Sequence, residues 1–138
     1  MSKPALYMFL LLVVWGCKPR VEQSQIPNVE VNIELNLNDI DNAPLLLVGG
    51  YRYIEGGVRG IIVRRASQDT FQAFERNCPY RPQDSCAVVE LHSSGFYFED
   101  PCCGSTFDLS GFPTGGPAQF PLKQYSTSRQ GDILYIFN

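Results

Sequence analysis

The chain has 138 residues, with 11 basic and 14 acidic side chains that give a net charge of −3. This length suits one domain, and a weakly acidic charge without basic runs argues against nucleic acid as a partner. Apolar residues at 44% and aromatic residues at 12% exclude a disordered chain. The single histidine, His92, excludes a histidine-rich metal site.

Residues 1–17 are typical of a bacterial lipoprotein signal peptide ending at Cys17. Lys3 is the only charge, an apolar run covers residues 5–15, and this run is too short to span a bilayer as a permanent helix. The final Val14-Trp15-Gly16-Cys17 resembles the lipobox whose cysteine is acylated, although Trp15 is unusual there. We therefore expect an exported lipoprotein that a lipid on Cys17 attaches to the periplasmic or outer-surface face of a membrane. An ordinary cleaved signal with an incidental cysteine is the alternative.

A polar, proline-containing segment, residues 18–28, follows and is predicted to be a flexible tether. From Val29 to Leu37 apolar and polar residues alternate, which predicts a half-buried strand. Further short strands, each bounded by turn residues, are predicted at Leu45–Val48, Tyr51–Ile54, Val58–Arg64, Thr70–Glu75, Ala87–Leu91, Phe96–Glu99, Phe120–Tyr125 and Asp132–Phe137. Many short strands without a helical period predict one all-β domain, a sandwich or a barrel, over residues 29–138.

Three loops interrupt the strands and concentrate cysteine, glycine and proline. They cover residues 77–86 with Cys78 and Cys86, residues 100–111 with Cys102 and Cys103, and residues 114–122. Rigid loops on a β scaffold are where function concentrates.

These loops resemble the two ligand-bearing boxes and the proline loop of the Rieske domain family. The matching residues are Cys78 in the first box, Pro101, Gly104, Ser105, Phe107, Asp108 and Gly111 in the second box, and Gly116-Pro117-Ala118 in the proline loop. The resemblance covers residues 46–138. It implies an antiparallel β-sandwich or barrel that carries two cysteine-bearing loops and a proline loop.

Three of the four ligand positions differ from the family pattern. Rieske centres use two cysteine thiolates on one iron and two histidine imidazoles on the other. The resemblance puts Tyr80 at the first histidine, Asp100 at the second cysteine and Cys103 at the second histidine. His92 lies outside both boxes in an expected turn. A standard Rieske [2Fe–2S] centre is therefore not expected.

Two chemistries remain for the four cysteines Cys78, Cys86, Cys102 and Cys103. Some Rieske proteins carry a disulfide that joins the two loops. Cys86 and Cys102 resemble that pair, which leaves Cys78 and Cys103 facing each other for a second disulfide. Four cysteines allow three connectivities, among which the sequence alone does not choose, and an oxidising compartment favours disulfides. The rival is a retained metal site with unusual ligands, namely a [2Fe–2S] cluster on the four thiolates or on a mixture of Cys, Asp and Tyr, or a mononuclear metal.

The favoured function is a non-enzymatic, disulfide-braced binding or structural module without a cofactor. A protein partner is expected at the loop tips, which comprise Tyr80, Pro101, Ser105, Gly116, Pro117 and Ala118. No catalytic residue is predicted, because His92 is not placed beside a cysteine and the chain is too short for an oxygenase domain. The alternative is an electron-transfer protein with an atypically ligated [2Fe–2S] cluster.

Overall fold

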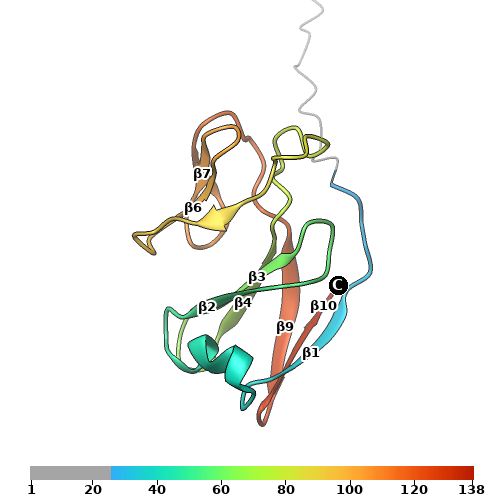
Figure 1. Cartoon of the computed structure of the whole chain (residues 1–138), viewed down its shortest axis with the longest axis vertical. Helices are drawn as coiled ribbons and strands as arrows, with labels where there is room; N and C mark the ends of the chain where they lie inside the picture. Colours follow the sequence, from blue (N-terminus) through green and yellow to red (C-terminus); the bar gives the residue numbers. More distant parts are fainter. Residues whose placement is uncertain (1–25) are drawn as a thin grey trace, which may run out of the picture.

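Two antiparallel sheets form the part of the chain that this computed structural model describes, residues 26–138. The larger sheet has six strands in the order β1-β10-β9-β4-β3-β2, and the smaller has four in the order β5-β6-β7-β8. The strands are β1 (Asn32–Asn36), β2 (Tyr51–Ile54), β3 (Ile61–Arg65), β4 (Phe71–Glu75), β5 (Glu90–Leu91), β6 (Phe98–Asp100), β7 (Ser105–Phe107), β8 (Pro113–Gly115), β9 (Gln124–Gln130) and β10 (Ile133–Phe137). In Figure 1 the larger sheet forms the lower part of the molecule, and β6, β7 and long loops lie above it. The expected all-β antiparallel domain is confirmed.

The predicted signal peptide, residues 1–17, and most of the predicted tether, residues 18–28, lie outside the described residues. Residues 26–28 belong to no strand or helix. Between residues 26 and 138 no helix has the length and apolar character needed to cross a membrane.

The alternating segment at residues 29–37 contains the edge strand β1, as predicted. It pairs with β10, where Ile33 lies opposite Ile136 and Leu35 lies opposite Leu134. Because successive residues of a strand point to opposite faces, these four side chains share one face of the larger sheet. The first core on that face comprises the buried residues Val31, Leu37, Leu45, Ile61, Val63, Phe71, Ala73, Tyr125, Leu134 and Ile136.

A second core joins the larger sheet to the smaller sheet and its loops. Strand β3 contributes to both cores, since Ile61 and Val63 pack into the first and Ile62 packs into the second. All three side chains are fully buried. The second core comprises Ile62, Phe74, Cys78, Ala87, Val89, Leu91, Phe98, Phe107, Ala118 and Leu122. It includes one of the cysteines and therefore positions the cysteine loops against the larger sheet.

The predicted strand at Leu45–Val48 is wrong. Residues Ile40–Leu46 form a short 3-10 helix, η1, and only Leu45 of the expected strand is buried. Pro44 lies inside this helix, and it has no N–H group to donate to a strand ladder. The apolar run that indicates a strand is therefore mostly exposed to solvent.

Strands β7 and β8 form where the sequence indicates only loops. Each has three residues, which are too few to show a period of two, so the sequence pattern does not reveal them. Strand β9 starts at Gln124 instead of Phe120 and continues to Gln130, five residues beyond its predicted end at Tyr125. Its second half is polar and mostly exposed, so it lacks the apolar alternation of β1. Strands β3, β5 and β6 begin two or three residues later than expected.

Candidate functional site

Three connections at one end of the larger sheet bring the cysteines together. The first cysteine loop (residues 76–89) runs from β4 to β5, the second cysteine loop (residues 101–104) joins β6 to β7, and the proline loop (residues 116–123) runs from β8 to β9. Figure 1 shows these connections in the upper part of the molecule.

A buried carboxylate fixes the start of the first cysteine loop. Glu75, the last residue of β4, is fully buried. It accepts hydrogen bonds from the backbone N–H groups of Val58 at 2.7 Å, Arg59 at 2.9 Å and Asn77 at 2.9 Å, and from the Tyr125 hydroxyl at 2.7 Å. Four donors offset the cost of removing the carboxylate from water. The loop therefore leaves the larger sheet from a fixed point.

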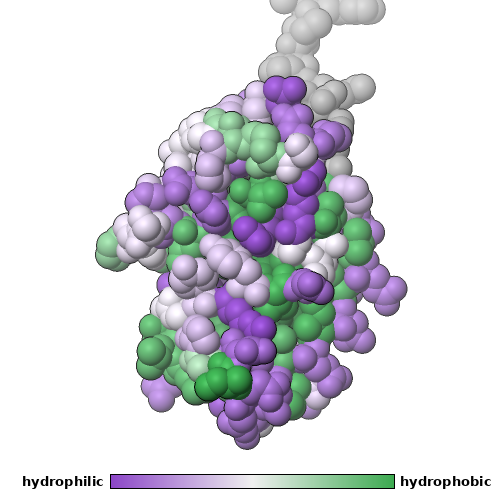
Figure 2. All heavy atoms as spheres, viewed as in Figure 1, coloured by the Kyte–Doolittle hydropathy of each residue, from purple (hydrophilic) through white to green (hydrophobic). Residues whose placement is uncertain are grey.

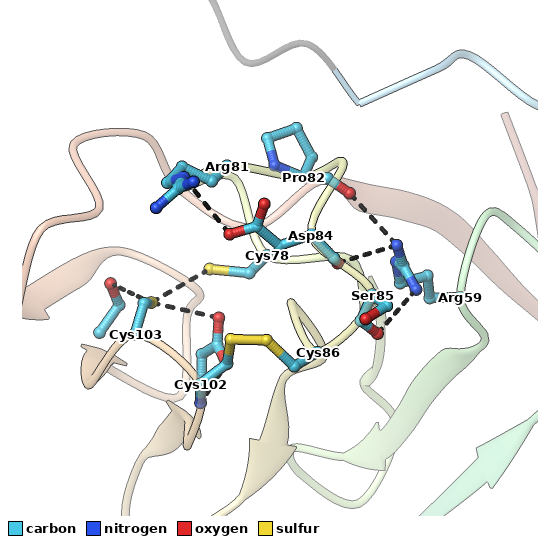
Figure 3. The surroundings of a disulfide bond; sticks show 11 residues. Arg59, Cys78, Arg81, Pro82, Asp84, Ser85, Cys86, Cys102 and Cys103 are labelled. Atoms are coloured by element: carbon cyan, nitrogen blue, oxygen red, sulfur yellow. Dashed lines mark hydrogen bonds and ion pairs between the residues drawn. A yellow bond between two sulfur atoms is a disulfide. The ribbon is translucent and has the colours of Figure 1, made fainter.

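An arginine side chain then fixes the course of this loop. The Arg59 guanidinium donates to the backbone carbonyl oxygens of Asp84 at 2.9 Å and Ser85 at 3.1 Å. At the outer end of the loop, Arg81 forms an ion pair with Asp84 at 3.3 Å (Figure 3). These contacts hold the outer part of the first cysteine loop in place.

Cys86 and Cys102 form a disulfide that joins the two cysteine loops, with their Cα atoms 5.6 Å apart (Figure 3). The resemblance to Rieske proteins implied this pairing. Cys78 and Cys103 are free thiols whose Sγ atoms are 3.9 Å apart, so the second expected disulfide is not formed. The disulfide takes Cys86 and Cys102 out of the four-cysteine ligand set.

Asp100 ends β6 and organises the second cysteine loop. Its backbone carbonyl oxygen accepts a hydrogen bond from the Gly104 N–H at 2.8 Å, which closes the turn. Its side-chain Oδ1 accepts from the Cys102 N–H at 2.9 Å. The other carboxylate oxygen, Oδ2, lies 3.2 Å from Sγ of Cys103. One carboxylate therefore both shapes the turn and faces a free thiol.

The proline loop packs directly on the second cysteine loop. Ser105 Oγ accepts a hydrogen bond from the Ala118 N–H at 3.0 Å and lies 3.0 Å from Sγ of Cys103. Gly116 has a φ of 75°, and a Cβ atom there would lie 2.5 Å from the backbone oxygen of Gly104. Glycine alone permits both this φ and this approach without strain. The Gly-Pro-Ala match therefore reflects a steric requirement of the packed loops.

Cys78, Asp100 and Cys103 converge in the space between the two cysteine loops. One ligand atom from each lies within 4.8 Å of the others. Cys78 and Asp100 are fully buried, and Cys103 is partly exposed. Figure 3 shows the Sγ atoms of Cys78 and Cys103 directed toward each other. The resemblance placed all three residues at ligand positions of the family, and the structure brings them together.

Within residues 26–138, no basic side chain forms an ion pair with Asp100. The ion pairs found between residues 26 and 138 are Arg52–Asp41 and Arg81–Asp84, and neither includes Asp100. Burial, and then the neighbouring Asp100 carboxylate, raises the pKa of the Cys78 thiol far above its usual value. Both effects disfavour the thiolate form that a nucleophilic cysteine needs.

The structure exposes only part of the predicted contact surface. Pro101, Gly116 and Pro117 are exposed, Tyr80 is half-buried against the second core, and Ser105 and Ala118 are buried. Ser105 and Ala118 are buried where the proline loop packs, and the Ala118 N–H donates a hydrogen bond to Ser105 Oγ there. They shape the surface without forming it.

His92 lies in the turn between β5 and β6, as expected. Its Nδ1 is 2.8 Å from the Ser94 hydroxyl, and its ring stacks on Tyr97 with the centroids 4.3 Å apart. It is not a member of the candidate ligand group around Cys78.

The residues present do not fit a Rieske [2Fe–2S] centre. Such a centre requires two thiolates and two imidazoles. Here the converging donors are two thiols and one carboxylate, and the only histidine bonds within its own turn. The chemistry of the donor set therefore disagrees with the cofactor that the fold implies.

The two-sheet architecture, the disulfide-linked loops and the packed proline loop define a Rieske-like fold. The chain is similar to the solved structure of the ferredoxin of carbazole 1,9a-dioxygenase from Nocardioides aromaticivorans IC177, with 20% identity, a TM-score of 0.50 and coverage of 79% of this chain and 97% of that chain. A complex of reduced oxygenase and oxidized ferredoxin in carbazole 1,9a-dioxygenase also matches, with 22% identity, a TM-score of 0.47 and coverage of 64% of this chain and 81% of that chain. No protein-family model and no curated protein sequence matches the chain. The likeness therefore concerns the fold.

Proposed function

We propose that this chain is an exported, lipid-anchored binding module whose Rieske-like fold has lost the standard cluster. Cys17 carries the lipid, and residues 18–28 form the tether between the membrane and the domain. The module presents a shaped surface to a protein partner and does not catalyse a reaction.

One observation carries this proposal: direct protein contacts connect the loops that a cluster connects in ordinary Rieske domains. The Cys86–Cys102 disulfide joins the two cysteine loops, and a hydrogen bond joins Ser105, the first residue after the second cysteine loop, to Ala118 of the proline loop. The loops therefore stay packed although three of the four family ligands have changed.

The proposed contact surface is small and rigid. It consists of the exposed Pro101, Gly116 and Pro117, beside the half-buried Tyr80. Proline side chains have little rotamer freedom to lose, so a partner that binds them incurs a small entropic cost. The arginine at the loop tip, Arg81, is exposed and pairs with Asp84, so it adds guanidinium N–H donors to this end of the molecule.

The proposal is tested on the full chain isolated from the membranes of the cells that make it. We expect lipid on Cys17, none on a Cys17→Ser variant, and no acid-labile sulfide. Two iron and two sulfide ions per chain would contradict the loss of the cluster and establish the electron-transfer alternative.

In the same cells, a photo-crosslinking residue is placed at position 117, with position 69 as the matched control. Asp69 is exposed in the turn between β3 and β4, at the end of the larger sheet away from the cysteine loops. We expect one defined protein to be crosslinked from position 117, with a lower yield when Arg81 is changed to alanine. Equal crosslinking from both positions would contradict a loop-tip contact surface.

A further inference from the structure

We infer that Cys78, Asp100 and Cys103 form a binding site for a single divalent metal ion of the zinc type. This site goes beyond the proposed function, because it gives the cluster-free module a metal centre of its own. The inference rests on the spacing of the three donor atoms, on the charge of the site and on the groups that orient each ligand.

The spacing of the donors matches one shared ion. Zinc–sulfur bonds of about 2.3 Å at a tetrahedral angle place two sulfur atoms about 3.8 Å apart. The Sγ atoms of Cys78 and Cys103 are 3.9 Å apart. A zinc–oxygen bond of about 2.0 Å places the oxygen about 3.5 Å from each sulfur. Oδ2 of Asp100 lies 3.2 Å from Sγ of Cys103, and the ligand atoms of all three residues lie within 4.8 Å of one another.

The charge of the site also favours a cation. Asp100 is fully buried and has no basic partner among residues 26–138, although an unpaired buried carboxylate is costly. A divalent ion bound by one carboxylate and two thiolates leaves a net charge of −1. Each thiol loses its proton to solvent when its sulfur binds the metal, so binding releases protons.

Each ligand is oriented by a further group. Oδ1 of Asp100 is occupied by the Cys102 N–H at 2.9 Å, which leaves Oδ2 facing the thiols. Ser105 Oγ lies 3.0 Å from Sγ of Cys103 while it accepts a hydrogen bond from the Ala118 N–H. When Cys103 is a thiolate, the Ser105 hydroxyl is free to donate to its sulfur. Outer groups of this kind fix ligands at metal sites, and Ser105 is thus a positioning residue.

The donor set selects the kind of ion. Two soft thiolates and one carboxylate suit zinc or ferrous iron, whereas magnesium and calcium prefer oxygen ligands. Cys103 is partly exposed, so the fourth tetrahedral position is open to water. Three protein donors, without an imidazole, are too few for the Rieske cluster, which has four.

The test is a cobalt titration of the full-length chain with its two free thiols reduced, under anaerobic conditions. Cobalt(II) is the probe because it substitutes for zinc and shows a sulfur-to-metal charge-transfer absorption. We expect one cobalt per chain, tetrahedral cobalt bands, and displacement of the cobalt by one equivalent of zinc. Asp100→Asn and Cys103→Ser are each expected to weaken cobalt binding at least about tenfold.

The matched control is Glu99→Gln. Glu99 neighbours Asp100 on β6 but points to the opposite face of the strand, so its variant is expected to bind cobalt as the unchanged chain does. Far-UV circular dichroism establishes that each variant is folded. Because Asp100→Asn keeps the shape of the side chain, it separates lost ligation from lost folding.

Three results overturn the metal site: a folded, reduced chain that binds neither cobalt nor zinc, equal binding by the Asp100→Asn and Glu99→Gln variants, or a Cys78–Cys103 disulfide in the chain isolated from its native membrane. None of these touches the proposed binding function. A chain that contains acid-labile sulfide overturns both proposals, so the two failures are distinguishable.

Discussion

The two carboxylate oxygens of Asp100 have different partners, and this division decides what the residue does. Oδ1 is bonded to the Cys102 N–H, which shapes the turn, whereas Oδ2 faces the free thiol of Cys103. A cysteine, which the family pattern has at this position, offers one sulfur and cannot do both. Asp100 therefore both organises the second cysteine loop and faces a free thiol.

Gly104 of the second cysteine loop and Gly116 of the proline loop have the same φ but different surroundings. The effects of replacing each by alanine can therefore be compared directly. Gly104 and Gly116 both have φ of 75°. A Cβ atom at Gly104 meets nothing within 4 Å, whereas one at Gly116 would lie 2.5 Å from the backbone oxygen of Gly104 and 2.5 Å from the Cα atom of Ser105. Gly104→Ala is therefore expected to lower the free energy of unfolding by about 1 kcal/mol, and Gly116→Ala by about 3 kcal/mol.

Urea denaturation of the two alanine variants measures this difference. Both variants have the strain of a positive φ, so this contribution cancels when their losses in free energy of unfolding are subtracted. The difference that is left measures how tightly the proline loop packs on the second cysteine loop. Equal losses of stability would show that the two loops are not in direct contact.

At the scale of elements, the small sheet is made of strands of two or three residues, and such short ladders contribute little stability alone. The disulfide supplies part of what they lack. It joins two cysteines whose sequence separation is 16, and a disulfide that closes a loop of this length stabilises a fold by about 3 kcal/mol.

The double variant Cys86→Ala/Cys102→Ala tests this contribution. We expect a loss of about 3 kcal/mol in the free energy of unfolding. Hydrogen exchange is expected to rise first at the loop amides of Cys78 and Gly104, which bond to Ala87 and Asp100, and only later in β3 and β4. A reducing agent should weaken the unchanged chain and leave the double variant unaffected. A uniform rise in exchange over both sheets would contradict a local effect.

At the scale of the whole molecule, Glu75 connects parts that lie far apart in the sequence. Its carboxylate joins the turn after β2, the end of β4 and, through Tyr125, strand β9. Burial, and then the hydrogen bond to Glu75, raises the pKa of the Tyr125 hydroxyl above its usual value of about 10. The unfolded chain therefore loses this proton at a lower pH than the folded chain.

The sign of the pH dependence follows from this difference. The stability that the neutral Tyr125 contributes is fully present below about pH 10 and is lost as the pH rises toward its folded pKa. Tyr125→Phe is expected to lower the free energy of unfolding by about 1–2 kcal/mol near neutral pH, and by less at about pH 11.

Urea denaturation at both pH values checks this, and Tyr135→Phe is the control. Tyr135 lies on β10, on the face opposite Leu134 and Ile136 and across from Glu34 of β1, and within residues 26–138 its hydroxyl forms no hydrogen bond to a carboxylate. All other titrating groups are common to the compared proteins, so the difference isolates Tyr125. A constant difference between the unchanged chain and Tyr125→Phe at the two pH values would contradict the prediction.

The sequence predicts a strand correctly where the signal is a pattern among residues that are close in the chain. The alternation in β1 and the turn-bounded segments of β2, β4 and β10 each depend on neighbours in the chain, so their strands form as expected. The prediction is wrong at residues 45–48, where an apolar run follows Pro44 and packs only through Leu45. Here the proline and the tertiary packing override a local preference for strand.

The sequence by itself determined that the domain is all-β and which loops carry the cysteines, and the resemblance to Rieske proteins implied that three of the four ligand positions differ. These are statements about residue types at fixed spacings. The tertiary structure decided which thiols pair, which expected contact residues are buried, and that Asp100 faces Cys78 and Cys103. The physical reason is distance along the chain: Cys78 and Cys103 are separated by 25 residues, and only the packing of the smaller sheet on the larger one brings their sulfur atoms to 3.9 Å.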